Sequence, residues 1–306
     1  MNPLGLATAH DLTSTEQDHG TTGRVSPVTL ILAALTPTFI ILVSDRQLTY
    51  RHSGKPADDA AMKAVFVNGH YAFAYTGPAE VQRSSDGVRE AQSVPTYRWI
   101  AEVAADHTGF PDPVLGALAE GADDVVPSFD KGLIVIGVGW AQDISTNPDG
   151  VYRPILALVH RGKDGAFMSW WDGLKPPVPR AMYNSRPDHK DKLSPYLDAV
   201  DPDSMEASAM SLVAGLRAVA SSDSTVSEDA LLLCIPLSVV QATDQGTDYN
   251  IRCDGPLSAE EITYQHYKIG GVEPMEKGPA LVIGSNILID PYVNPGGFIQ
   301  VSQTHP

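Results

Sequence analysis

Two continuously apolar runs open the patterned part of the chain. Residues 29–35 and 39–45 contain few polar positions and are joined around Pro37, which suits a turn and cannot donate a hydrogen bond to a strand ladder. Continuous runs of this length are typical of strands covered on both faces, whereas strict alternation marks a strand with one solvated face. We therefore predict a strand hairpin that lies between two other layers of the fold.

Further strand patterns follow along the chain. Residues 62–67 and 70–76 are separated by Asn68-Gly69, a dipeptide typical of the tight turn in a β-hairpin. The turn sequence RGKDG predicts a second hairpin later in the chain. The remaining predicted strands lie at residues 132–140, 153–160, 166–171, 230–235, 280–283 and 298–301.

Helical spacing of apolar residues replaces the strand pattern between these runs. It predicts a helix over residues 97–106. Asp112-Pro113 has the form of an N-cap followed by proline at the first helical position, which predicts a helix through residues 114–119. Residues 80–91 are a further helix candidate.

The longest predicted helix covers residues 203–222. Asp203 and Glu206 are spaced as a capping box at its start, and its apolar residues recur on one side. The segment before it, residues 172–202, contains six prolines and is expected to be mostly irregular.

The order of these elements predicts the fold class and its division into parts. Blocks of strands followed by helices indicate an α+β fold in which helical layers cover two packed sheets. Residues 1–27, rich in Thr, Ser, Asp and Gly, are expected to be a flexible leader or propeptide, and residues 28–240 the domain. Residues 241–306 are expected to be a C-terminal extension packed on the domain, with a short helix opened by Ser258 and Glu261.

Composition excludes several classes of partner. A formal net charge of −16 argues against a nucleic acid or an anionic membrane as partner. The apolar runs are shorter than a membrane span, and the N-terminus lacks the basic and apolar regions of a secretory signal. We expect a cytoplasmic protein in which Cys234 and Cys253 are free thiols, although one disulfide between them remains an alternative.

Four residues in the first third of the domain resemble a known pattern. Thr29 opens a strand, Asp45 follows in "SDRQLT", and Lys63 and Gly77 come later in order. This arrangement resembles the proteasome β-subunits, which belong to the N-terminal nucleophile (Ntn) hydrolases. The resemblance implies a four-layer αββα sandwich over residues 28–240.

The resemblance also implies a role for each matching residue. Thr29 matches the nucleophile, Asp45 its buried acidic partner and Lys63 the lysine that activates the threonine. Gly77 matches the glycine whose backbone N–H stabilises the oxyanion. A further acid and serine after the late helix correspond best to Asp223 and Ser227, with a spacing that departs by one from the family pattern.

The chemistry explains why a threonine must come first in such a chain. Its hydroxyl needs a base, and a terminal α-amine, with an ordinary pKa of about 7.7–8.0, supplies one. Here the amine becomes free only if the bond between Val28 and Thr29 is cut. The family usually has glycine before the threonine, and valine restricts the backbone there. The leader is therefore either a propeptide with an unusual junction or a permanent extension that leaves Thr29 inert.

The resemblance therefore implies a threonine-type amidohydrolase that acts on peptides or small amides. Histidine and cysteine spacing gives no metal site, and no dinucleotide or phosphate loop is present, so neither metal nor cofactor is expected. By analogy with the family we expect a homo-oligomer. One alternative is an inactive protein of the same fold that serves in assembly or binding. Another is an unrelated two-sheet α+β domain, in which Thr29, Asp45 and Lys63 only fill or cap strands.

Overall fold

The structure is a computed structural model of the chain. It describes residues 29–49, 56–58, 61–67, 70–83, 92–107, 111–126, 132–143, 151–173, 180–184, 186–237, 280–283, 287–289 and 299–300. Four sequence predictions lie outside these residues: the leader, the Asn68-Gly69 turn, the state of Cys253 and the helix at Ser258 and Glu261.

The smaller of two large sheets contains the apolar hairpin. Its strand order is β12-β1-β2-β13 and every pair is antiparallel. The predicted strands 29–35, 39–45 and 230–235 are confirmed. The Thr36 hydroxyl closes the hairpin turn by donating to the carbonyl of Phe39 at 2.7 Å and accepting from its N–H at 2.9 Å. The strands are β1 (Ile31–Leu35), β2 (Phe39–Asp45), β12 (Arg180–Asn184) and β13 (Ala230–Pro236).

The larger sheet has the order β11-β10-β9-β6-β5-β14-β15-β16. Its pairs are antiparallel except for β5 and β14, which run parallel. The strands predicted along the chain from residue 62 to residue 171, and the two near the C-terminus, are confirmed within a few residues. They are β5 (Ala64–Val67), β6 (Tyr71–Thr76), β9 (Ile134–Asp143), β10 (Val151–Arg161), β11 (Phe167–Gly173), β14 (Ala280–Ile283) and β16 (Ile299–Gln300). Strand β15 (Ile287–Ile289), which was not predicted, lies between β14 and β16.

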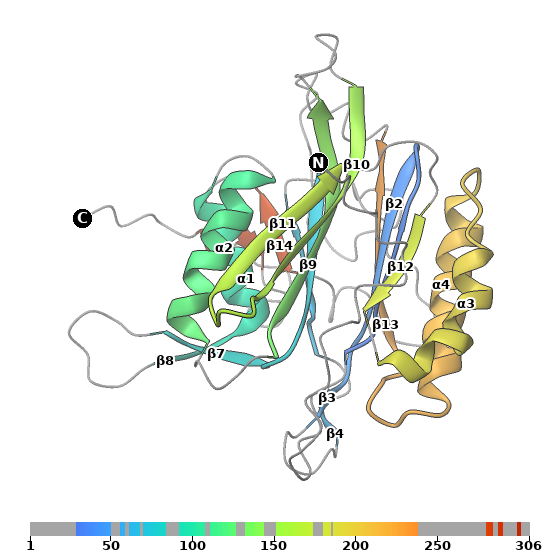
Figure 1. The fold of residues 1–306 in the computed structure, drawn as a ribbon, viewed down its shortest axis with the longest axis horizontal. Coiled ribbons are helices and arrows are strands. Elements are labelled where there is room, and N and C mark those ends of the chain that lie inside the picture. The colour runs from blue at the N-terminus through green and yellow to red at the C-terminus, as the bar shows by residue number, and fades with distance from the viewer. Residues whose placement is uncertain are drawn as a thin grey trace.

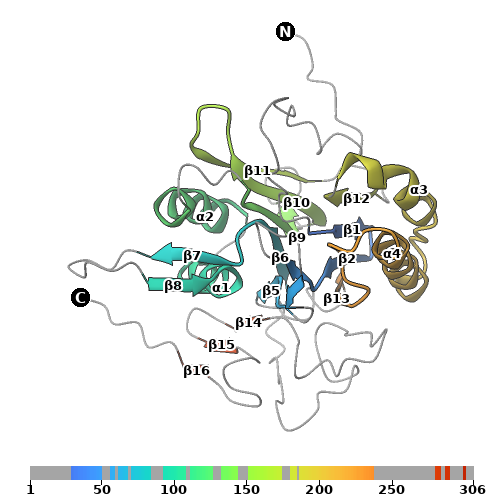
Figure 2. The same cartoon turned by 90° about the horizontal axis from the view of Figure 1, so that it is seen from below.

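A pair of helices covers the outer face of each sheet, and the two sheets face each other (Figures 1 and 2). Helices α1 (Thr96–Asp106) and α2 (Asp112–Val125) share an apolar cluster with the larger sheet. Helices α3 (Lys190–Asp198) and α4 (Met205–Ala220) share another with the smaller sheet. The predicted α+β class is therefore confirmed.

A third apolar cluster fills the space between the sheets. Alternate residues of β2 belong to different clusters: Leu42 contributes to the one between the sheets, and Val43 to the one beneath the helices. This explains the continuous apolar run, because both faces of the strand are buried. Burial also raises the pKa of the free Cys234 thiol on β13, which packs beneath the helices, to about 12.

Two sequence expectations are wrong in part. The helix candidate at residues 80–91 begins instead as β7 (Glu80–Arg83), which pairs with β8 (Gln92–Pro95) and buries only Val81. The segment 172–202 is more ordered than its prolines suggest, since it contains β12, the short 3-10 helix η2 (Pro187–His189) and α3. Tertiary packing overrides local propensity in α3, where Leu193 and Leu197 are buried in the cluster shared with α4.

The helix caps also differ from prediction by one residue. Ser204 caps α4, because its hydroxyl accepts a hydrogen bond from the Ala207 N–H at 3.2 Å, whereas Asp203 had the predicted spacing. Helix α2 begins at Asp112 itself, after Pro111. The two short strands β3 (Leu48–Thr49) and β4 (Pro56–Asp58) pair with each other beyond the end of β2.

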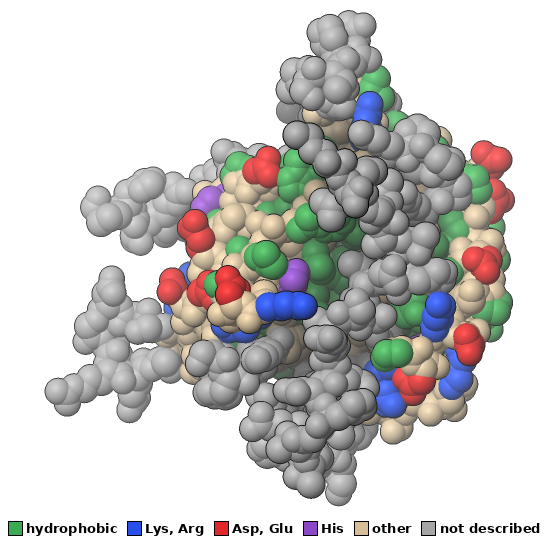
Figure 3. All heavy atoms as spheres, viewed as in Figure 1, with side chains coloured by type: hydrophobic (Ala, Val, Ile, Leu, Met, Phe, Trp, Pro, Cys, Tyr) green, Lys and Arg blue, Asp and Glu red, His purple; other side chains and the backbone are tan. Residues whose placement is uncertain are grey.

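The molecular surface agrees with the charge of the sequence. In Figure 3 acidic side chains lie over both helix pairs, and hydrophobic side chains line the hollowed centre of the same face. Within the described residues, no helix combines the length and apolar character needed to cross a membrane.

Two glycines provide a matched test of the packing. A Cβ at Gly137 would lie 2.8 Å from Phe73 Cε1 and 3.2 Å from Ala157 Cβ, so Gly137→Ala should destabilise the protein. We expect a loss of about 1–3 kcal/mol from overpacking. At Gly116 in α2 an added Cβ meets no atom within 4 Å, and Gly116→Ala should stabilise. The expected gain is about 0.5–1 kcal/mol, since alanine favours helix. Urea unfolding should show that the free energy of unfolding falls in the Gly137→Ala variant and rises in the Gly116→Ala variant. A Gly137→Ala variant as stable as the wild type would contradict the close packing around β9.

Candidate functional site

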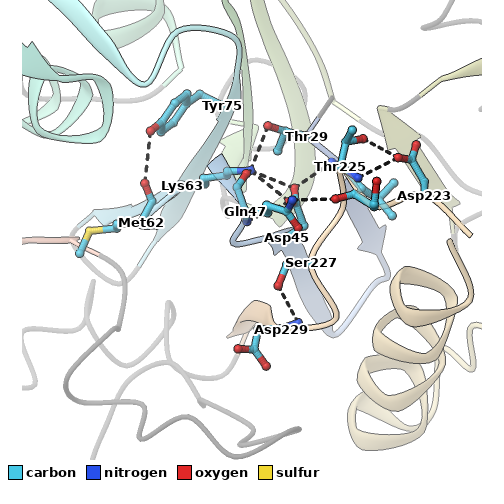
Figure 4. Close-up of polar contacts among 12 residues, drawn as sticks. Thr29, Asp45, Gln47, Met62, Lys63, Tyr75, Asp223, Thr225, Ser227 and Asp229 are labelled. Carbon is cyan, nitrogen blue, oxygen red and sulfur yellow. Dashed lines mark hydrogen bonds and ion pairs between the residues drawn. The ribbon is translucent and has the colours of Figure 1, made fainter. Parts of the chain in front are cut away.

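Lys63 is the centre of a buried polar cluster. The residue is only 1% exposed, and its Nζ donates to Thr29 Oγ1 at 3.2 Å (Figure 4). The same Nζ lies 3.2 and 3.1 Å from the two carboxylate oxygens of Asp45. It also donates to the main-chain carbonyl of Gln47. The ammonium therefore contacts a hydroxyl, a carboxylate and a carbonyl at once.

The strand arrangement explains why residues distant in sequence meet here. In the antiparallel pair of β1 and β2, Ile31 lies opposite Ser44, which places the start of β1 beside the end of β2. The Leu30 N–H donates to Asp45 Oδ1 at 2.9 Å, and the Asp45 N–H donates to the Leu30 carbonyl at 3.0 Å. Lys63 directly precedes β5 and comes from the facing sheet. The cluster thus joins the two sheets at one end of the apolar layer between them.

Burial and charge have opposite effects on Asp45. Burial raises the pKa of its carboxyl above the ordinary value. The positive charge of Lys63 and the backbone N–H groups of Gln47 and Leu30 favour the ionised form and oppose that rise. The Gln47 N–H donates to Asp45 Oδ2 at 3.1 Å. The carboxylate and the ammonium therefore depend on each other, since neither has solvent to replace its partner.

Gly77 occupies a backbone position that requires glycine. Its φ is +118°, and a Cβ there would lie 2.4 Å from the carbonyl oxygen of Gly132. It directly follows β6, a neighbour of the strand that Lys63 precedes. Among the described residues no hydrogen bond joins Gly77 to Thr29, Asp45 or Lys63, so its oxyanion role stays a prediction.

Asp223 and Ser227 have partners other than Lys63. Asp223 Oδ2 lies 3.0 Å from His189 Nε2, and its Oδ1 accepts from the N–H and hydroxyl of Thr225. Ser227 Oγ accepts a hydrogen bond from the Asp229 N–H at 3.0 Å. Five of the six predicted site residues therefore fall into two groups, with Thr29, Asp45 and Lys63 in direct contact and Asp223 and Ser227 in a loop close by (Figure 4). Gly77 lies apart from both, directly after β6.

Gln47 is a residue of the site that the sequence did not indicate. Its main chain contacts both Asp45 and Lys63, and its side-chain amide donates to the Ser224 carbonyl at 2.7 Å. Its only sequence signal is its place two residues after Asp45. Main-chain contacts do not depend on the type of side chain, so the pattern of polar residues could not indicate that Gln47 belongs to the site.

The arrangement can polarise a hydroxyl in a dry environment. An ammonium that donates to Thr29 Oγ1 stabilises negative charge on that oxygen, and the effect is stronger away from water. Within the part of the chain that the structure describes, no group of three or more His, Cys, Asp or Glu side chains could hold a metal ion.

Comparisons with known proteins do not assign the chain. No protein-family model matches it, and none of the curated proteins is detectably similar. The geometry of the cluster must therefore carry the functional argument.

The buried pair makes a prediction for Lys63. Lys63→Ala should lower the free energy of unfolding by about 3–5 kcal/mol, because it leaves the Asp45 carboxylate buried without its cation. The exposed Lys163 in the turn before β11 is the control, and Lys163→Ala should change stability by no more than about 0.5 kcal/mol. Chemical denaturation of both variants measures the difference. Equal midpoints for Lys63→Ala and the wild type would rule out a buried ion pair.

Asp223 makes a prediction for the effect of pH. Burial alone would raise its pKa, but hydrogen bonds from Thr225 and the charges of His189 and Arg186 outweigh burial and lower the pKa below 3.8. The folded protein therefore holds the ionised carboxylate more strongly than the unfolded chain does. This stabilisation is fully present above pH 3.8 and is lost as the pH falls through the lower folded pKa.

Asp223→Asn should accordingly destabilise the protein at pH 6 by about 1–2 kcal/mol. The difference from the wild type should shrink as the pH falls below 3.8 and through the lower folded pKa, where the wild-type carboxyl becomes protonated too. Urea unfolding at a series of pH values measures it. A difference that stays constant across the series would show that the charge of Asp223 contributes nothing.

Proposed function

We propose that the protein is an Ntn hydrolase of the proteasome β-subunit type. It cleaves amide bonds with Thr29 as nucleophile once the residues before Thr29 are removed. The observation that carries the proposal is the 3.2 Å contact between Lys63 Nζ and Thr29 Oγ1, within a buried pair of Lys63 and Asp45. These are the three residues to which the sequence resemblance gives the nucleophile, its activating lysine and its acidic partner.

The order of layers supports the same proposal. A helix pair, the larger sheet, the smaller sheet and a second helix pair follow one another. This order agrees with a four-layer αββα sandwich of the Ntn type, which is the fold that the resemblance implies. The polar cluster then lies where the two central layers meet at one end.

Each residue has a chemical role in the proposed reaction. The free α-amine of Thr29 accepts the hydroxyl proton, and the Thr29 oxygen attacks the substrate carbonyl. The Lys63 ammonium stabilises charge on that oxygen, and Asp45 holds the ammonium in place. The Gly77 N–H is the proposed oxyanion donor, and such a donor contributes about 3–4 kcal/mol to the transition state. The tetrahedral intermediate then collapses with cleavage of the C–N bond, and the protonated α-amine returns its proton to the leaving amine. Water hydrolyses the resulting acyl-enzyme, which releases the acid and regenerates Thr29.

The proposed substrates are peptides or small amides, and the proposed active form is a homo-oligomer.

Val28 favours a second candidate function, that of an inactive protein with the same fold. A β-branched residue restricts the backbone at the junction, so the chain would keep its leader and Thr29 would stay acylated. Such a protein would serve as an assembly or binding module.

Thr29 variants test the proposal. A chain that begins at Thr29, released from a removable tag, should hydrolyse small amide or ester substrates, and Thr29→Ala should not. Thr29→Ser should keep part of the activity, because it retains the hydroxyl and the amine. The full-length chain should be slower until it is cut, and intact mass shows whether residues 1–28 have been lost.

Thr38 is a suitable control for the loss of a threonine hydroxyl. It is exposed in the turn between β1 and β2, where its hydroxyl donates only weakly to the Pro202 carbonyl at 3.4 Å. The Thr38→Ala variant should hydrolyse the same small amide or ester substrates at the wild-type rate. If the folded chain starting at Thr29 is no faster than its Thr29→Ala variant on a broad substrate panel, the nucleophile proposal is wrong.

A further inference from the structure

The polar cluster continues beyond Lys63 through one side chain. Gln47 is 8% exposed, and its Nε2 donates to the Ser224 carbonyl at 2.7 Å. Its N–H donates to Asp45 Oδ2 and its carbonyl accepts from Lys63 Nζ. Gln47 therefore contacts the Asp45 carboxylate and the Lys63 ammonium through its main chain, and a distant loop through its side chain.

The location of Gln47 makes that side-chain contact important. It lies between the end of β2 and the start of β3, outside any strand ladder. Its backbone is therefore not held by sheet pairing of its own. The hydrogen bond to Ser224 supplies a fixed point for the carbonyl that receives the Lys63 ammonium.

The loop that carries Ser224 is held in turn by Asp223. The Thr225 N–H and hydroxyl donate to Asp223 Oδ1 at 2.9 and 2.6 Å. His189 is 2% exposed, and its Nε2 lies 3.0 Å from Asp223 Oδ2. Arg186 Nη1 approaches the same oxygen at 3.5 Å. The carboxylate thus ties the loop to η2, at the start of α3.

We propose that Gln47 is a positioning residue that holds the Lys63 ammonium against Thr29, and that the Asp223–His189 pair acts on it through the Ser224 loop. An ammonium has three donors. Those of Lys63 lie within reach of both Asp45 carboxylate oxygens, the Gln47 carbonyl and Thr29 Oγ1, so the acceptors on Asp45 and Gln47 fix the position from which Nζ reaches Thr29. Asp223 influences the site through this chain of contacts, without touching the nucleophile. The kinetic consequence rests on the proposed function, whereas the placement of the ammonium does not.

The placement of the ammonium can be measured in the full chain without any activity. The protein is labelled with ¹³C at the lysine ε-carbons, and the Lys63 signal is identified by its loss in Lys63→Met. Gln47→Met keeps the length of the side chain and removes its N–H donors, so it should shift the Lys63 signal. The control is Gln82→Met on β7, where an exposed amide donates to Ser93 Oγ at 3.3 Å, and the signal should not move.

Asp223 provides a second variant, remote from β2. Asp223→Ala should shift the Lys63 signal in the same direction, and its effect should not add to that of Gln47→Met, because both act through one path. Asp188→Ala is the control, since Asp188 is an exposed partner of the same Arg186. An unmoved Lys63 signal in Gln47→Met would overturn the proposal, and so would additive shifts in the double variant.

The kinetic test uses the form of the protein that shows hydrolysis dependent on Thr29. There Gln47→Met should lower kcat by about tenfold to a hundredfold, as expected for a displaced catalytic group, with KM changed less than about twofold. An unchanged kcat would overturn the positioning role. If no form hydrolyses any substrate, the proposed function fails, and the lysine signal still decides whether Gln47 places the ammonium.

Discussion

The burial of one ammonium constrains this fold more than any other single interaction. An uncompensated charge inside a protein costs several kcal/mol, so Lys63 is tolerable only with acceptors in place. Asp45 and Gln47 supply them from the end of β2, whereas Lys63 comes from the facing sheet. The two sheets therefore have a required alignment at this end. Elsewhere between them the apolar packing of the described residues is non-directional, apart from the hydrogen bond from Trp140 Nε1 to the Ile235 carbonyl at 3.0 Å.

The same constraint connects the apolar run to its polar margin. The layer between the sheets is filled by buried apolar side chains of both sheets. At one end of this layer lie two buried polar residues, Thr29 just before β1 and Asp45 at the end of β2. A dry neighbourhood strengthens every electrostatic contact in the cluster. The hydrophobic layer thus strengthens the effect of the Lys63 charge on the Thr29 hydroxyl.

Local pattern predicted much of the fold and only part of the site. Strand 39–45 was predictable because its continuous apolar run reports burial on both faces. The meeting of Thr29, Asp45 and Lys63 could be anticipated only through the family resemblance. Asp223 lies elsewhere because its carboxylate binds donors that the fold brings near, Thr225 and His189. Strand β12 and helix α3 were missed because tertiary contacts stabilise them in a proline-rich segment.

The parallel pairing of β5 with β14 has a consequence for folding during synthesis. Strand β5 can pair with β6 as soon as both are synthesised, because the two are neighbours in sequence. Its other partner, β14, is synthesised much later, since Ala280 pairs with Val65. While the ribosome is still making the later segments, the edge of the strand next to Lys63 has no partner. An open edge of this kind invites pairing with other chains. Truncation before residue 280 would therefore turn a central strand into a permanent edge and promote aggregation.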